Sequence, residues 1–94
     1  MSGKNGQPRT LGEAHDALRR VLPFPQASAQ DWLAHHERAA QLYQHISQVD
    51  PSHHHEALAF AAIERADAAT VAAQIRASTA QARPEIDQPS GGAR

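Results

Sequence analysis

Prolines interrupt the middle of the chain at only two places, and these interruptions predict three helices. Between residues 10 and 82 the prolines are Pro23, Pro25 and Pro51. Proline has no backbone N–H and restricts the residue before it, so it begins or ends helices rather than continuing them. The segments between the breaks carry apolar residues at steps of three and four, which is the spacing of one helix face. The sequence therefore predicts an all-α fold. The expected helices span about 10–22, 28–49 and 51–82.

The expected start of each helix carries a side chain that can accept a hydrogen bond from a free backbone N–H. Thr10 and Glu13 have the form of a capping box, in which each side chain accepts from an N–H of the first turn. Ser28 opens the second segment and is followed by an acidic residue. Asp50 stands directly before Pro51, and proline is favoured at the first helical position. The Asp50 carboxylate is therefore expected to accept from the free N–H groups of the third helix.

The short Asp-Pro joint predicts that the second and third helices form a long antiparallel hairpin. In that hairpin Tyr43 would lie beside Leu58, and Trp32 beside Ala69. The second helix supplies large side chains and the third mainly alanine, so their backbones can approach closely. The shorter N-terminal helix is expected to pack across the hairpin. The predicted core side chains are Leu18, Val21, Trp32, Tyr43, Ile46 and Leu58.

At 94 residues the chain is expected to form a single domain. Residues 1–9 and 83–94 are rich in glycine, proline and polar residues, so both are expected to be disordered tails. The domain would then span residues 10–82. Its core is thin, because 20 of the apolar residues are alanine and only 18 are larger.

Composition excludes several classes of function. The chain has no cysteine, and its formal net charge of -1 disfavours a strongly basic nucleic-acid-binding domain. Neither a phosphate-binding loop nor a nucleophile elbow occurs, so we predict no enzymatic activity and no catalytic residue. No segment approaches the roughly 18 apolar residues of a membrane span, and no signal peptide is recognised. The expected location is the cytoplasm, without a nucleic-acid or membrane partner.

Seven histidines are the most unusual compositional feature of the chain. A rigid helical metal site uses two ligands at i and i+4, and no two histidines have this spacing. Around the predicted turn, however, a histidine of the second helix comes level with the first turn of the third. A zinc site could form there. The candidate ligands are His45, Asp50, His53, His54 and His55.

The three consecutive histidines have a second interpretation. They begin the third helix, where the helix dipole disfavours positive charge. Neutral imidazoles can donate and accept hydrogen bonds at such a position, so His54 or His55 could pack against the end of the second helix instead. Both hypotheses stay open: a structural role at the turn, and a metal- or pH-responsive site.

The third segment also indicates a function. Its alanines surround the helix axis, so the helix is apolar on several sides while few large residues are available to cover it. The outward alanines either contact a neighbouring helix or simply supply helix propensity. We predict a non-catalytic helical protein–protein interaction module, an adaptor or regulator, whose partner is another protein or a second copy of the chain. No cofactor is expected. The alternative is a metal- or pH-responsive histidine protein with zinc.

Three parts of the chain carry a resemblance. They are Trp-Leu-x-x-His-x-Arg-Ala-x-x-x-Tyr at 32–43, Val-Asp at 49–50 followed by His-His-His-Glu-Ala-Leu at 53–58, and Glu-Arg at 64–65. With this pattern the chain resembles a group of short actinobacterial proteins of unknown function, over residues 11–76. The resemblance implies a source and a helical fold, and it brings no activity with it.

Overall fold

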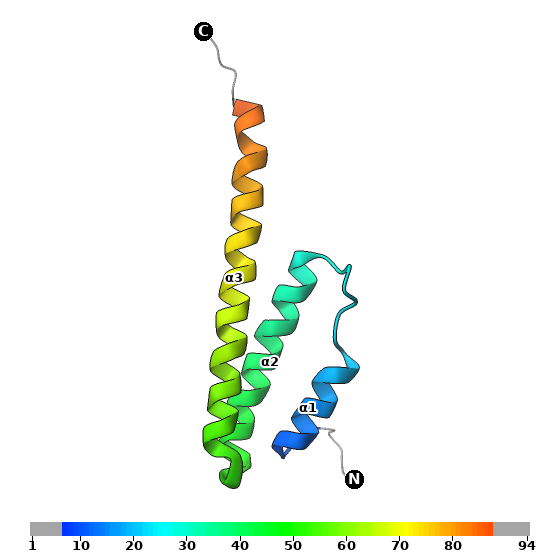
Figure 1. The fold of residues 1–94 in the computed structure, drawn as a ribbon, viewed down its shortest axis with the longest axis vertical. Coiled ribbons are helices and arrows are strands. Elements are labelled where there is room, and N and C mark those ends of the chain that lie inside the picture. The colour runs from blue at the N-terminus through cyan, green and yellow to red at the C-terminus, as the bar shows by residue number, and fades with distance from the viewer. Residues whose placement is uncertain (1–6, 88–94) are drawn as a thin grey trace.

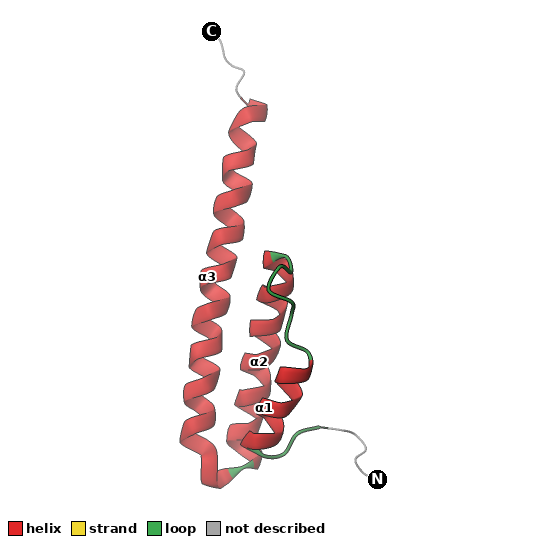
Figure 2. Cartoon of the chain, turned by 45° about the vertical axis from the view of Figure 1, so that its right-hand side comes forward, coloured by secondary structure: helices red, strands yellow, loops and turns green. Residues whose placement is uncertain are grey.

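The computed structural model describes residues 7–87. The described chain forms α1 (Leu11–Arg20), α2 (Ala29–Val49), the short 3-10 helix η1 (Pro51–His53) and α3 (His54–Asp87). No strand occurs in this part of the chain (Figure 2). The all-α prediction is therefore confirmed. Among the described helices, none is both long and apolar enough to cross a membrane.

The helices form a hairpin with a third helix beside it (Figure 1). α2 and α3 run antiparallel, and α1 lies along the half of α2 that is nearest the turn. After α1 a loop continues away from the turn to the start of α2, at the far end of the hairpin. α3 continues past that end, which gives the molecule an elongated shape of 67 × 25 × 20 Å. This is the predicted long hairpin with a shorter N-terminal helix.

The predicted caps begin the first two helices. The Thr10 hydroxyl accepts from the N–H of Glu13 at 3.1 Å, and the Ser28 hydroxyl accepts from the N–H of Asp31 at 3.0 Å. The Glu13 carboxylate accepts from the N–H of Arg9 at 2.8 Å, one residue earlier than the usual capping box. Arg9, expected in a disordered tail, is thereby tied to the first turn of α1.

The prediction of Val21 as a core residue is wrong. α1 ends at Arg20, and the N–H of Val21 bonds to the carbonyl of Leu18 at 3.2 Å. Val21 has a non-helical backbone (φ -111°, ψ 17°), and its side chain lines an open groove between α1 and α2. Its side chain is 51% exposed.

The third helix is longer than predicted. It was expected to end at residue 82, and it continues to Asp87 through Pro84. Proline removes one backbone hydrogen bond, while the alanine, glutamine and arginine residues before it are good helix formers that carry the helix onward. The remaining parts of the predicted tails, residues 1–6 and 88–94, lie outside the described residues.

The core lies where α1 meets the hairpin. Ile46 is the largest fully buried side chain, and Leu18 and Tyr43 are buried as predicted. Trp32 and Leu58, predicted as core, are only partly buried. Tyr43 stacks on Phe60, with ring centroids 5.2 Å apart. The core cluster consists of Leu11, Ala14, Leu18, Ala39, Tyr43, Ile46, Ala57 and Ala61.

Candidate functional site

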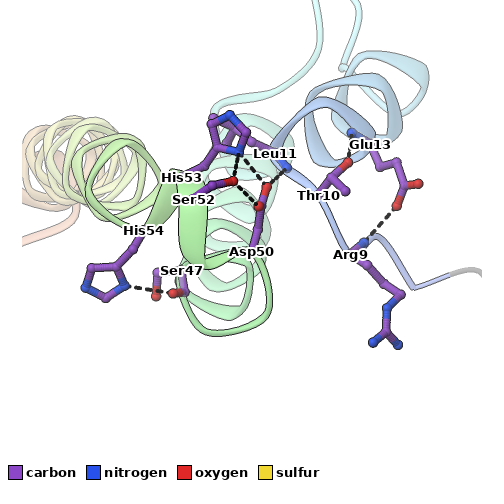
Figure 3. A network of polar contacts seen from close by, with 9 residues as sticks. All are labelled: Arg9, Thr10, Leu11, Glu13, Ser47, Asp50, Ser52, His53 and His54. Carbon is purple, nitrogen blue, oxygen red and sulfur yellow. Dashed lines mark hydrogen bonds and ion pairs between the residues drawn. The ribbon is translucent and has the colours of Figure 1, made fainter.

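Asp50 is the centre of a polar network at the hairpin turn (Figure 3). Its Oδ2 accepts from the backbone N–H of Leu11 at 2.9 Å and from Nδ1 of His53 at 2.9 Å. The Ser52 hydroxyl donates to Oδ1 at 3.2 Å. The expected cap on the third helix is therefore wrong: the chain after Asp50 forms a 3-10 turn without a side-chain cap, and the carboxylate caps α1 instead.

Asp50 is only 8% exposed. The N–H of Leu11, helped by the His53 and Ser52 side chains, lowers the pKa of Asp50 against the opposing effect of burial. The ionised form is thus the one that holds α1 to the turn. Leu11 is 39 residues away along the chain, so no local sequence signal could reveal this contact.

Replacing Asp50 by alanine is expected to lower the free energy of unfolding at neutral pH. It is also expected to make that free energy decrease less as the pH falls into the acid range. Because the folded pKa is below its ordinary value, the stabilisation by Asp50 is complete above about pH 4 and is lost as the pH falls through the lowered value. Urea unfolding followed by circular dichroism between about pH 2 and pH 7 measures this. Asp16 is an exposed acid on α1 and provides the control variant Asp16→Ala. In this variant the free energy of unfolding should depend on pH as it does in the natural chain. An unchanged acid response in Asp50→Ala would contradict the assigned role.

The consecutive histidines at the turn have structural partners. Nδ1 of His54 donates to the carbonyl oxygen of Ser47 at 2.7 Å, one of the last α2 carbonyls, which lack partners within a helix. The ring of His55 lies edge-on to that of His54, with centroids 5.1 Å apart. The hypothesis that His54 packs against the end of the second helix is confirmed.

The structure does not gather all five predicted zinc ligands. It joins Asp50 to His53 and places His54 beside His55. His45 instead lines a groove of about 360 Å³ between α1 and α2. Zinc binding at the turn therefore stays a prediction.

A second cluster lies on the hairpin away from the turn, and sequence analysis missed it. Nδ1 of His36 on α2 donates to Oε1 of Glu64 on α3 at 2.7 Å. Asp67 follows one turn along α3, and one ligand atom each from His36, Glu64 and Asp67 lie within 4.8 Å of one another. Among the residues that the structure describes, these three are the one group of histidine and acidic side chains whose ligand atoms come this close together. The predicted hairpin could have revealed this cluster, because its register brings residue 36 level with residue 65, next to Glu64.

His35 and Trp32 border this cluster. His35 is 8% exposed, and its ring lies 5.6 Å from the His36 ring and 5.8 Å from Trp32, centroid to centroid. Burial lowers the pKa of His35, and the neighbouring His36 lowers it further, against the opposing charge of Glu64. No protein group among the described residues bonds to its Nδ1. His35 is therefore a buried neutral ring with an unpaired nitrogen.

His15 joins α1 to both hairpin helices. Its Nδ1 is hydrogen-bonded to the Tyr43 hydroxyl at 2.7 Å, and its ring meets Phe60 edge-on at 5.0 Å. Burial raises the pKa of Tyr43, and the charge of Glu64 raises it further. The hydroxyl thus stays protonated at neutral pH and can donate as well as accept.

A second groove, which we call the alanine groove, runs between α2 and α3 and has a volume of about 630 Å³. None of its lining residues belongs to α1. Most of them are apolar, and an acid and a base also lie on it. The lining residues are Leu33, Glu37, Ala40, Gln41, Arg65, Ala68, Ala69 and Ala72.

Comparison of the chain with known protein families, with curated proteins and with solved structures finds no match in any of the three. The resemblance to short actinobacterial proteins stays a prediction.

Proposed function

We propose that this chain is a small non-catalytic helical module that acts by binding another protein, with the cytoplasm as its location, and that its alanine groove binds a second copy of the chain. The observation that carries the proposal is the groove itself. α1 covers one side of the hairpin, whereas the alanine groove is lined by α2 and α3 alone. Two such hairpins packed groove to groove form a four-helix arrangement.

The groove fits a helix backbone. Ala40 and Ala68 are buried at its floor, and Ala69 is exposed. Because the alanine side chain is a single methyl group, a helix of a partner can pack with its axis close to those of α2 and α3. Ala69 is exposed and Leu33 and Ala72 are partly exposed, so the groove offers apolar side chains to a partner.

The charges on the groove favour a second copy as the partner. Glu37 lies on α2 and Arg65 on α3, and Nη2 of Arg65 donates to Oε1 of Gln44 at 2.6 Å, which ties its guanidinium to α2. In a two-fold symmetric pair, a contact between residue i and residue j occurs twice. Glu37 of each copy can therefore meet Arg65 of the other.

Sedimentation equilibrium tests this proposal. The natural chain is expected to dimerise, and Ala69→Glu is expected to be monomeric because it places a carboxylate in the apolar interface. The control is Ala59→Glu, at another exposed alanine of α3 that does not line the groove, and this variant should still dimerise. A natural chain that is monomeric up to roughly 1 mM, a limit of about -4 kcal/mol for association, would reject the homodimer. Equal dimerisation of Ala69→Glu and Ala59→Glu would reject the alanine groove as the dimer interface.

A further inference from the structure

We propose that His36, Glu64 and Asp67 bind one zinc ion between α2 and α3. Their ligand atoms lie within 4.8 Å of one another. Zinc bonds to nitrogen and oxygen of about 2.0–2.2 Å place tetrahedral ligand atoms roughly 3.3 Å apart. Binding of the ion therefore requires the three side chains to rotate so that their ligand atoms come closer together.

The backbone brings the three ligands together. His36 lies on α2 at the level of Glu64, as their hydrogen bond shows. Glu64 and Asp67 are three residues apart on α3, a spacing that puts both side chains on one helix face. All three are in the interior of long helices rather than in loops, so the ligands are held on rigid elements, as metal sites require.

The burial and charge of the cluster suit a divalent cation. The side chains of His36 and Glu64 are 18% and 20% exposed, and Asp67 is exposed, which leaves a path from solvent. A neutral imidazole with two carboxylates has a charge of -2, equal and opposite to that of the ion. The ion pairs among the described residues include no lysine or arginine bound to Glu64 or Asp67, so no fixed cation competes.

The donor set favours zinc over calcium and magnesium. One nitrogen and two carboxylate oxygens are ligands that zinc accepts, whereas calcium and magnesium prefer oxygen alone. Three protein ligands leave the fourth tetrahedral position for water. The buried His35 ring, with its unpaired Nδ1, borders the cluster. Such nitrogens are commonly satisfied by water or an ion.

Calorimetric titration of the full chain with zinc chloride tests the proposal. The natural chain is expected to bind one zinc ion with a Kd below about 10 μM, close to -7 kcal/mol. His36→Gln and Asp67→Asn are each expected to bind at least roughly tenfold more weakly. Asp67→Asn changes an exposed side chain without changing its shape, so the fold should survive, and circular dichroism checks this.

Two further measurements separate this site from the histidines at the turn. The double variant His54→Gln/His55→Gln should bind zinc as the natural chain does. The fluorescence of Trp32, whose ring lies 6.0 Å from His36, should change on zinc addition in the natural chain and in the double variant. The absence of binding tighter than about 10 μM in the natural chain, or unchanged affinity in both His36→Gln and Asp67→Asn, would overturn the proposal. Loss of binding in the double variant alone would place the ion at the turn and also overturn it.

Discussion

The Ile46→Ala variant is expected to lose about 2 to 5 kcal/mol of unfolding free energy. Ile46 is fully buried in the core that α1, α2 and α3 share, so truncation removes apolar contacts and leaves a cavity. A small domain has only about 5 to 15 kcal/mol of stability in total. This one substitution should therefore bring the chain close to unfolding at room temperature.

The chain offers a matched control for this variant. Ile63 is also on a helix, and it is 54% exposed, so Ile63→Ala is expected to change stability by about 0.5 kcal/mol or less. Urea unfolding followed by circular dichroism measures both variants. Equal losses for Ile46→Ala and Ile63→Ala would contradict the assignment of Ile46 to the core.

Tyr43→Ala is expected to lose about 3 to 5 kcal/mol, as other buried aromatic residues do. Tyr43 is 5% exposed, stacks on Phe60 of α3 and is hydrogen-bonded to His15 of α1. It thus contacts all three helices, and its removal weakens both the hairpin and the attachment of α1. Urea unfolding of the natural chain and of the Tyr43→Ala variant measures the difference in their free energies of unfolding.

Tyr43→Phe separates the ring from the hydroxyl. It keeps the stacking on Phe60 and removes only the hydrogen bond to His15, so its expected cost is about 1 kcal/mol. A Tyr43→Phe variant as unstable as Tyr43→Ala would show that the hydroxyl, rather than the ring, holds the helices together.

Much of the fold follows from local sequence signals. The proline breaks and the Thr10 and Ser28 caps predicted the starts of α1 and α2, and the short joint at Asp50 predicted the hairpin. Local signals could not reveal the tertiary cap of Asp50 on α1, because its partner is distant in sequence. They also failed at Val21, where the apolar spacing continues but the helix does not.

The candidate zinc site was missed for a different reason. The i and i+4 spacing applies within one helix, and the predicted cross-hairpin ligands all lie at the turn, whereas His36 meets Glu64 and Asp67 farther along the hairpin. The side-chain contacts of the turn histidines could be anticipated in part, since His54 was expected against the end of the second helix. That His45 faces a different groove depends on where α1 packs, and the sequence contains no direct signal for that.

The central claim is that the alanine groove binds a second copy of the chain, and thiol cross-linking tests it most directly. The chain has no cysteine, so Ala69→Cys gives each copy a single thiol in the groove, and Ala59→Cys gives a single thiol outside it. With a short bifunctional maleimide, we predict a covalent dimer for Ala69→Cys and little or none for Ala59→Cys. A monomer from both variants, or equal yields of dimer, would contradict the claim.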